Sequence, residues 1–121
     1  MRMSNKFELG LFCLGNGITV CNKAVTENGD YKQIAHISNG GNIKLYVSES
    51  YIPVEDMEKI RKVAEEEKQK FQADFLKRDI YSQYEKILDS ISTDDFLKAT
   101  RDKRPLEEKI IDLRELYFSI A

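Results

Sequence analysis

Residues 7–47, FELGLFCLGNGITVCNKAVTENGDYKQIAHISNGGNIKLYV, decide the fold of this chain. Apolar runs of strand length are interrupted three times, at Gly15-Asn16-Gly17, Asn28-Gly29 and Asn39-Gly40-Gly41. Asn-Gly is a strong hairpin signal, because the central residues of the tightest turns between antiparallel strands need a positive φ. The stretch therefore predicts four antiparallel strands joined in order by three tight turns.

The positions of the turns predict which residues pair across the strands. A two-residue first turn at Asn16-Gly17 pairs Cys13 with Val20, and a two-residue second turn pairs Val20 with Ile37. The third turn allows two registers. We prefer its three-residue form, because it sets Ile43 against Ile37 and so matches apolar residues with each other.

This register gives the sheet one apolar face, which we expect to form the core: Phe7, Leu9, Leu11, Cys13, Ile18, Val20, Ala24, Ala35, Ile37, Ile43, Leu45 and Val47. The second face is mixed in character and carries Glu8, Phe12, Leu14, Thr19, Cys21, Lys23, Lys32, Ile34, His36, Lys44 and Tyr46. A face in contact with water should alternate more strictly. Either later helices partly cover this second face, or a partner binds there.

The second half of the chain has a helical pattern. Residues 52–121 hold 31 charged residues, against 9 in residues 1–51. Pro53 and Pro105 each suit the start of a helix, and apolar residues recur after them at helical spacing. The pattern drifts in phase near Arg78-Asp79, where we expect either a break or a long helix that leaves the sheet. Ser92-Thr93-Asp94-Asp95 is a strong N-cap cluster.

We therefore expect a single α+β domain over residues 1–121. A four-stranded antiparallel β-meander occupies residues 1–51, and three or four α-helices occupy residues 52–121, with the first helix packed on one sheet face. The remaining apolar residues of the helices have to be buried on the second sheet face, on one another or against another protomer. A homodimer through the C-terminal helices is one such arrangement.

The composition is that of an ordinary soluble domain. Of the 121 residues, 41% are hydrophobic and 33% are charged, and the formal net charge of -2 does not call for a polyanionic partner. The first ten residues hold no apolar run of signal-peptide length, and no stretch approaches the roughly 20 apolar residues of a membrane span. We expect a cytoplasmic protein without membrane contact.

No motif predicts a cofactor, a metal site or an enzymatic activity. Two cysteines lack the spacing of a zinc site, and Cys13 and Cys21 project to opposite faces, which disfavours a disulfide. The sole histidine, His36, falls across from Cys21 in this register, but no orienting third group or oxyanion arrangement accompanies the pair. We interpret the pair as packed cross-strand neighbours and expect a non-enzymatic protein.

Two groups of residues are candidates for binding. On the second sheet face, aromatic residues are interleaved with cations, as in sheet-based modules for single-stranded nucleic acid; the group is Phe12, Lys23, Lys32, His36, Lys44 and Tyr46. The densest basic cluster suits phosphates or an acidic protein patch and consists of Lys98, Arg101, Lys103 and Arg104. Each group also has a plain interpretation, as a half-covered sheet face and as a solvated loop.

Residues 15–53, GNGITVCNKAVTENGDYKQIAHISNGGNIKLYVSESYIP, resemble a sequence type of small uncharacterised accessory proteins from phages and conjugative elements of Gram-positive gut bacteria. The likeness extends to about residue 71 and carries no functional residue. It implies a setting. Small acidic proteins of mobile elements often occlude a host defence complex, as anti-CRISPR proteins do, or serve the element's own replication and transfer machinery.

Two hypotheses follow. The first is a non-enzymatic protein-binding module of a mobile genetic element that inhibits a bacterial defence nuclease complex of the CRISPR type. Its contact surface is either the helical half or the mixed sheet face. The alternative is a nucleic-acid-binding accessory protein that uses the aromatic and basic residues of that sheet face.

Overall fold

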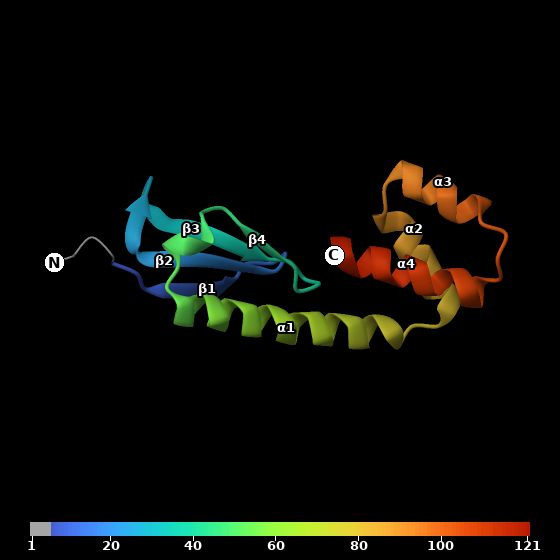
Figure 1. Ribbon diagram of the computed structural model, residues 1–121, viewed down its shortest axis with the longest axis horizontal. Helices are drawn as coiled ribbons and strands as arrows, with labels where there is room; N and C mark the ends of the chain where they lie inside the picture. The colour runs from blue at the N-terminus through green and yellow to red at the C-terminus, as the bar shows by residue number, and fades with distance from the viewer. Residues whose placement is uncertain (1–5) are drawn as a thin grey trace.

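The structure, a computed structural model, describes residues 6–121 and confirms the expected α+β fold. A four-stranded antiparallel sheet in the order β1-β2-β3-β4 is followed by a 3₁₀ turn and four α-helices (Figure 1). The elements are β1 (Leu9–Cys13), β2 (Ile18–Glu27), β3 (Asp30–Ile37), β4 (Ile43–Leu45), η1 (Glu49–Tyr51), α1 (Val54–Leu76), α2 (Ile80–Ser90), α3 (Thr93–Arg101) and α4 (Leu106–Ile120). The helical structure is interrupted between α1, which ends at Leu76, and α2, which begins at Ile80, where the apolar pattern drifts in phase.

The first hairpin has a longer loop than the sequence predicts. Cys13 pairs with Ile18 rather than with Val20, so the predicted register is wrong by two residues. Gly15 and Gly17 adopt positive φ values of 81° and 102°, which lets residues 14–17 reverse the chain as a four-residue loop. Because the shift is even, each strand residue keeps its predicted face.

The second hairpin has the predicted turn but not the predicted pairing along its strands. Asn28 and Gly29 adopt φ values of 54° and 89°, as a type I′ turn requires, and the residues that flank them pair with each other. Further from the turn the register shifts twice, so that Ile18, and not Val20, faces Ile37.

One of these shifts is a bulge at Ile34, which the prediction placed on the second face. Between the pairs Val20–Ala35 and Cys21–Gln33, β3 holds one residue more than β2, and that residue is Ile34. An extra residue bends one strand and exchanges the faces of the residues beyond it. Ile34 is fully buried and belongs to the core.

The third hairpin matches the prediction. Ile37 pairs with Ile43, as the three-residue loop requires. Gly41 in this loop adopts a φ of 82°, and a Cβ at this position would collide with the backbone oxygen of Ala64 in α1. Glycine therefore serves both the turn and the close approach of the loop to the helix.

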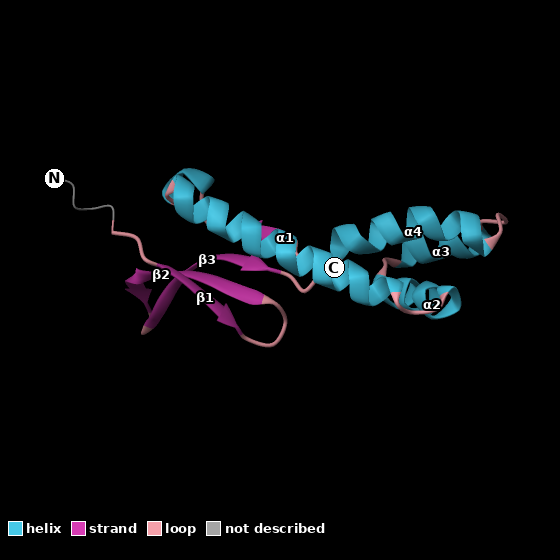
Figure 2. Cartoon of the chain, turned by 90° about the horizontal axis from the view of Figure 1, so that it is seen from below, coloured by secondary structure: helices cyan, strands magenta, loops and turns pink. Residues whose placement is uncertain are grey.

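One buried core joins the sheet to the first half of α1, and its members are Ile18, Val20, Ile34, Ala35, Ile37, Ile52, Met57, Ile60 and Ala64. Other predicted core residues pack against its margin, namely Phe7, Leu9, Ile43, Leu45 and Val47. Three predicted core residues are exposed instead: Leu11, Cys13 and Ala24. Leu11 and Cys13 belong to the second half of β1, and in Figure 2 α1 runs along the β3 side of the sheet, away from the end of β1 that leads into the first loop. Ala24 falls in the irregular stretch between two paired segments.

A second core lies at the far end of α1, where α2, α3 and α4 gather (Figure 1). Its buried residues are Phe75, Ile87, Ala99, Ile110, Leu113 and Tyr117. The chain's own helices thus bury part of the apolar surface that the sheet does not need. Within residues 6–121, no helix combines the length and apolar character that a bilayer crossing requires.

Side chains cap the starts of α2 and α3, and the cap of α3 is the one that the sequence predicts. The Ser92 side chain accepts a hydrogen bond from the backbone N–H of Asp95 where α3 begins. The Asp79 side chain accepts in the same way from the backbone N–H of Ser82 at the start of α2. The hydrogen bonds of Asp79 with Ser82 lower the pKa of the Asp79 carboxyl. Local capping chemistry therefore defines where the shorter helices begin.

Hydrogen bonds tie the sheet to the last helix. The side-chain amide of Asn42 donates to the backbone oxygens of Phe118, at 3.0 Å, and Ser119, at 3.3 Å. The backbone N–H of Gly40 donates to the backbone oxygen of Ala121 at 3.1 Å. The β3–β4 loop thereby supplies donors to carbonyls that the end of an α-helix leaves without an intrahelical partner.

Candidate functional site

The four strands place a row of side chains on the sheet face that α1 leaves uncovered. Phe12 pairs with Thr19, Thr19 with His36, and His36 with Lys44, so the row crosses the whole sheet in register. Directly paired residues of neighbouring strands project to the same face. We call this surface the aromatic face and define it by Phe12, Thr19, Tyr31, His36, Lys44 and Tyr46.

Phe12 and Tyr31 form a stacked pair on this face. Their ring centroids lie 6.1 Å apart, and their planes differ by 18°. Gly10 makes room for the pair, because a Cβ at this position would lie 2.9 Å from the Phe12 ring and 2.7 Å from the Lys23 side chain. Tyr31 is 47% exposed, so the pair offers a flat apolar surface to a partner.

Lys44 and Tyr46 form a cation–π pair on the same face. The Lys44 Nζ lies 5.6 Å from the centroid of the Tyr46 ring, and Tyr46 is 48% exposed. In the part of the chain that the structure describes, no carboxylate forms an ion pair with Lys44.

The other two lysines predicted for this face are paired with acids. The Lys23 Nζ lies 3.2 Å from a carboxylate oxygen of Glu8. Lys32 lies on the opposite face, so its predicted placement is wrong; its Nζ lies 3.3 Å from Glu27 and 5.7 Å from the centroid of the Tyr51 ring.

The bulge at Ile34 explains both the misplaced lysine and an aromatic residue that the prediction missed. Residues of β3 between the turn and the bulge exchange faces, which moves Lys32 to the core side and Tyr31 to the aromatic face. Turn residues carry no signal for this bulge.

Cys21 and His36 do not face each other, so this predicted pairing is wrong. Cys21 pairs with Gln33, and His36 pairs with Thr19, because the register shifts between Asn22 and Thr26 and again at Ile34. Burial raises the pKa of the Cys21 thiol, with a smaller increase from the charge of Asp30. A raised pKa reduces the thiolate that a nucleophile needs. Among residues 6–121, no three His, Cys, Asp or Glu side chains gather as a metal site would require.

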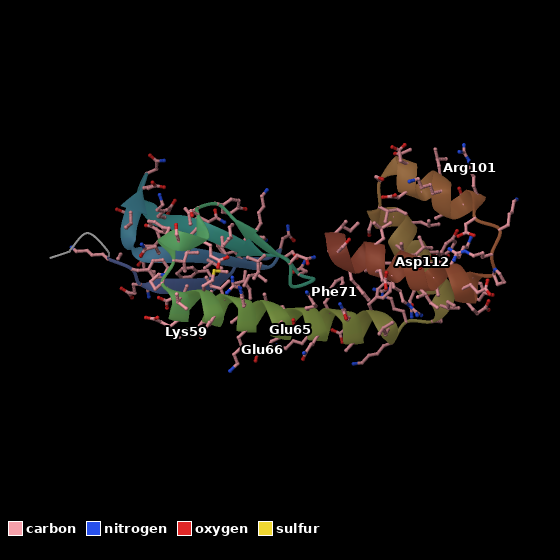
Figure 3. All side chains as sticks on the ribbon, viewed as in Figure 1. Lys59, Glu65, Glu66, Phe71, Arg101 and Asp112 are labelled. Carbon is pink, nitrogen blue, oxygen red and sulfur yellow. The ribbon has the colours of Figure 1, made fainter. Side chains whose placement is uncertain are left out.

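The predicted basic cluster lies around the connection from α3 to α4, at the end of the molecule away from the sheet (Figure 3), and consists of Lys98, Arg101, Lys103 and Arg104. Arg104 is engaged, since its Nη2 lies 2.8 Å from Asp102 and 3.0 Å from Asp112. Hydrogen bonds from Arg104 hold the pKa of the Asp102 carboxyl at about 2. The two predicted groups therefore do not form one site.

The Lys109 side chain caps the C-terminal end of α3, a role that the sequence analysis did not predict. Its Nζ donates to the backbone oxygens of Ala99, at 3.1 Å, and Asp102, at 3.3 Å, and lies 5.0 Å from the centroid of the Tyr84 ring. A cation at such carbonyls stabilises a helix end. Its partners are backbone atoms of another helix, which leave no signature in the sequence.

No protein family, curated protein or solved structure matches this chain. A functional conclusion therefore depends on the chemistry of the aromatic face itself.

Proposed function

We propose that this chain is a non-enzymatic protein-binding module that presents its aromatic face to a protein partner. The observation that carries the proposal is that Phe12, Tyr31 and Tyr46 lie on the sheet face opposite the core shared with α1, with the two tyrosines 47% and 48% exposed. Aromatic rings are enriched in protein interfaces, because they bury a large area and leave few side-chain rotations to freeze.

The charges on this face favour a protein over a polyanion. Glu8 neutralises Lys23, and Lys32 lies on the other face, so Lys44 is the cation of the aromatic face that has no acidic partner among the described residues. Nucleic acid binding draws its affinity from several free cations along a backbone path. Aromatic residues with few charges around them are instead typical of the core of a protein interface.

The resemblance of residues 15–53 to accessory proteins of mobile elements supports one class of partner. We infer that the partner is a component of a bacterial defence complex, such as a CRISPR-type nuclease. The chain would inhibit this complex by occluding one of its functional surfaces. Inhibition by occlusion needs no catalytic residue. The separation of Cys21 from His36 and the raised pKa of the Cys21 thiol agree with such a role.

Single-stranded nucleic acid is the second candidate for the same face. The specific observation that favours it is the stacked Phe12–Tyr31 pair, since bases stack on exposed rings. Among the described residues of the aromatic face, Lys44 is the one cation without an acidic partner. This hypothesis therefore predicts weak binding of the nucleic acid, which added salt abolishes.

Size-exclusion chromatography with light scattering separates these functions. The purified protein is run alone, with a purified CRISPR effector complex from a Gram-positive gut bacterium, and with a single-stranded oligonucleotide. A complex of fixed stoichiometry with the effector supports the proposal. Co-elution with the oligonucleotide alone would support nucleic acid binding in place of the proposed function. Co-elution with neither would show that the CRISPR effector is not the partner.

A pair of variants assigns any complex to a surface. The double variant Tyr31→Ala, Tyr46→Ala should lose the complex. Tyr81→Ala is the matched control, because Tyr81 on α2 is 69% exposed and lies outside the aromatic face. If both variants retain the complex, the aromatic face is not the binding surface.

A further inference from the structure

We propose that two copies of this chain pair through the free edge of β1, which joins their sheets into one continuous antiparallel sheet. The inference concerns the edge of the sheet and not the aromatic face. Its failure would leave the proposed function intact, and the converse also holds.

The two edges of the sheet differ in how they are protected. β4 is only three residues long and carries Lys44, and short or lysine-bearing edges resist pairing with another strand. β1 is five residues long, and its sequence, LGLFC, contains no charged residue and no proline. The features that normally protect an edge are therefore missing from β1.

The hydrogen-bond pattern shows which backbone groups of β1 face outward. The backbone N–H of Lys23 donates to the oxygen of Glu8 at 2.7 Å, which fixes the phase of the alternating antiparallel ladder. By that alternation, three residues direct both their N–H and their C=O away from β2: Leu9, Leu11 and Cys13. Among the described residues, no hydrogen bond outside the ladder reaches these groups.

A second copy of the chain complements this edge. Two identical antiparallel strands related by a two-fold axis at Leu11 set Leu11 against itself and Leu9 against Cys13 of the other copy. Gly10 then lies opposite Phe12 of the other copy, so the smallest residue meets the largest. Leu11 is 39% exposed and is therefore accessible to the second copy. No charged residue of one β1 strand lies opposite a charged residue of the other.

The size of the contact sets its strength. A five-residue edge buries less than the roughly 1,600 Å² of a standard stable interface. We therefore expect a dimer that dissociates on dilution.

Light scattering over a range of concentrations, up to about 1 mM, tests the pairing. The wild-type mass should rise from 14.1 kDa toward twice that value. Leu11→Lys should remain at the mass of one chain, because it places two like charges on the two-fold axis. Ile111→Lys is the matched control, since Ile111 is a 56% exposed residue of α4, and it should still form the dimer. Circular dichroism establishes that both variants fold.

A disulfide trap provides an independent readout. Opposed Cα atoms in a hydrogen-bonded antiparallel pair lie about 5.5 Å apart, within the range that a disulfide spans. Leu11→Cys in a Cys13→Ser background should form a linked dimer in air. Glu66→Cys in the same background, on the exposed surface of α1 (Figure 3), should not. A wild-type chain that stays single at every concentration overturns the proposal. So does a dimer that survives Leu11→Lys, is lost in Ile111→Lys or is not trapped at position 11.

Discussion

The covered face of the sheet and its aromatic face differ in what holds their side chains. Ile37 on the covered face is fully buried and belongs to one core with Ile60 of α1. On the aromatic face, Tyr31 and Tyr46 remain 47% and 48% exposed. Burial of a large apolar side chain stabilises a fold by about 1.5–3 kcal/mol, so the exposed tyrosines realise much of that gain only when a partner covers them. The covered face therefore contributes stability, and the aromatic face is suited to binding.

The largest effect should come from the covered face. Ile37→Ala should lower the free energy of unfolding by about 2–5 kcal/mol, because it removes buried methyl groups and leaves a cavity. Urea unfolding monitored by circular dichroism measures this change. Tyr46→Ala should change the same quantity by only about 0.5 kcal/mol, as is usual for exposed substitutions. Equal losses of unfolding free energy in the two variants would contradict the distinction between the two faces.

Asn22→Ala should have the next largest effect. The Asn22 side chain is fully buried, accepts from the backbone N–H groups of Glu8 and Ala24, each at 3.0 Å, and donates to the Tyr51 hydroxyl at 3.1 Å. Removing the amide leaves buried groups without partners, which should cost about 1–3 kcal/mol of unfolding free energy. Asn16→Ala, in the exposed first loop, is the control, and a similar loss there would show that the buried network is unimportant.

Asn42→Ala should have a smaller effect, because it removes bonds between the sheet and α4 and no core contact. The expected loss is about 0.5–1.5 kcal/mol. Hydrogen exchange should speed up at the C-terminal end of α4, where Asn42 binds the oxygens of Phe118 and Ser119. Asn39→Ala in the same loop should leave this exchange unchanged. Uniform protection in both variants would mean that the loop does not hold the helix.

The smallest effect should be the response of Asp102 to acid, far from both sheet faces. Because its pKa in the folded chain is lowered to about 2, the ion pair with Arg104 contributes fully above the ordinary carboxyl pKa of about 4 and is lost as the pH falls toward 2. The backbone N–H of Arg104, which donates to Asp102 at 2.9 Å, reports this change in NMR spectra. A midpoint near pH 4 would contradict the assigned pair.

The sequence predicts much of the fold, because most of its signals are local. The Asn28-Gly29 turn, the Ser92 cap and the three-residue third loop each depend on a few neighbouring residues, and each is found in the structure. An even register error in the first hairpin left the predicted faces intact.

The bulge at Ile34 marks the limit of that reasoning. No turn residue predicts this bulge, whose Ile34 is buried in the core shared with α1, and one extra residue exchanged the faces of Tyr31 and Lys32. Phe12 and Tyr46 therefore lie on the sheet face where the sequence predicted them, whereas Lys32 lies on the other face and Tyr31 was not predicted for this face. The helical core was equally hidden, because its contacts join segments far apart in the chain.

The most direct test of the aromatic face is the affinity of the partner that co-elutes with the chain. Calorimetric titration compares the wild type, the double variant Tyr31→Ala, Tyr46→Ala and the control Tyr81→Ala, with urea unfolding of each. We expect the double variant to bind at least roughly tenfold more weakly while its stability is nearly unchanged, and the control to bind as the wild type does. Equal affinity of all three proteins, or a loss of affinity that follows a loss of stability, would contradict the assignment of binding to this face.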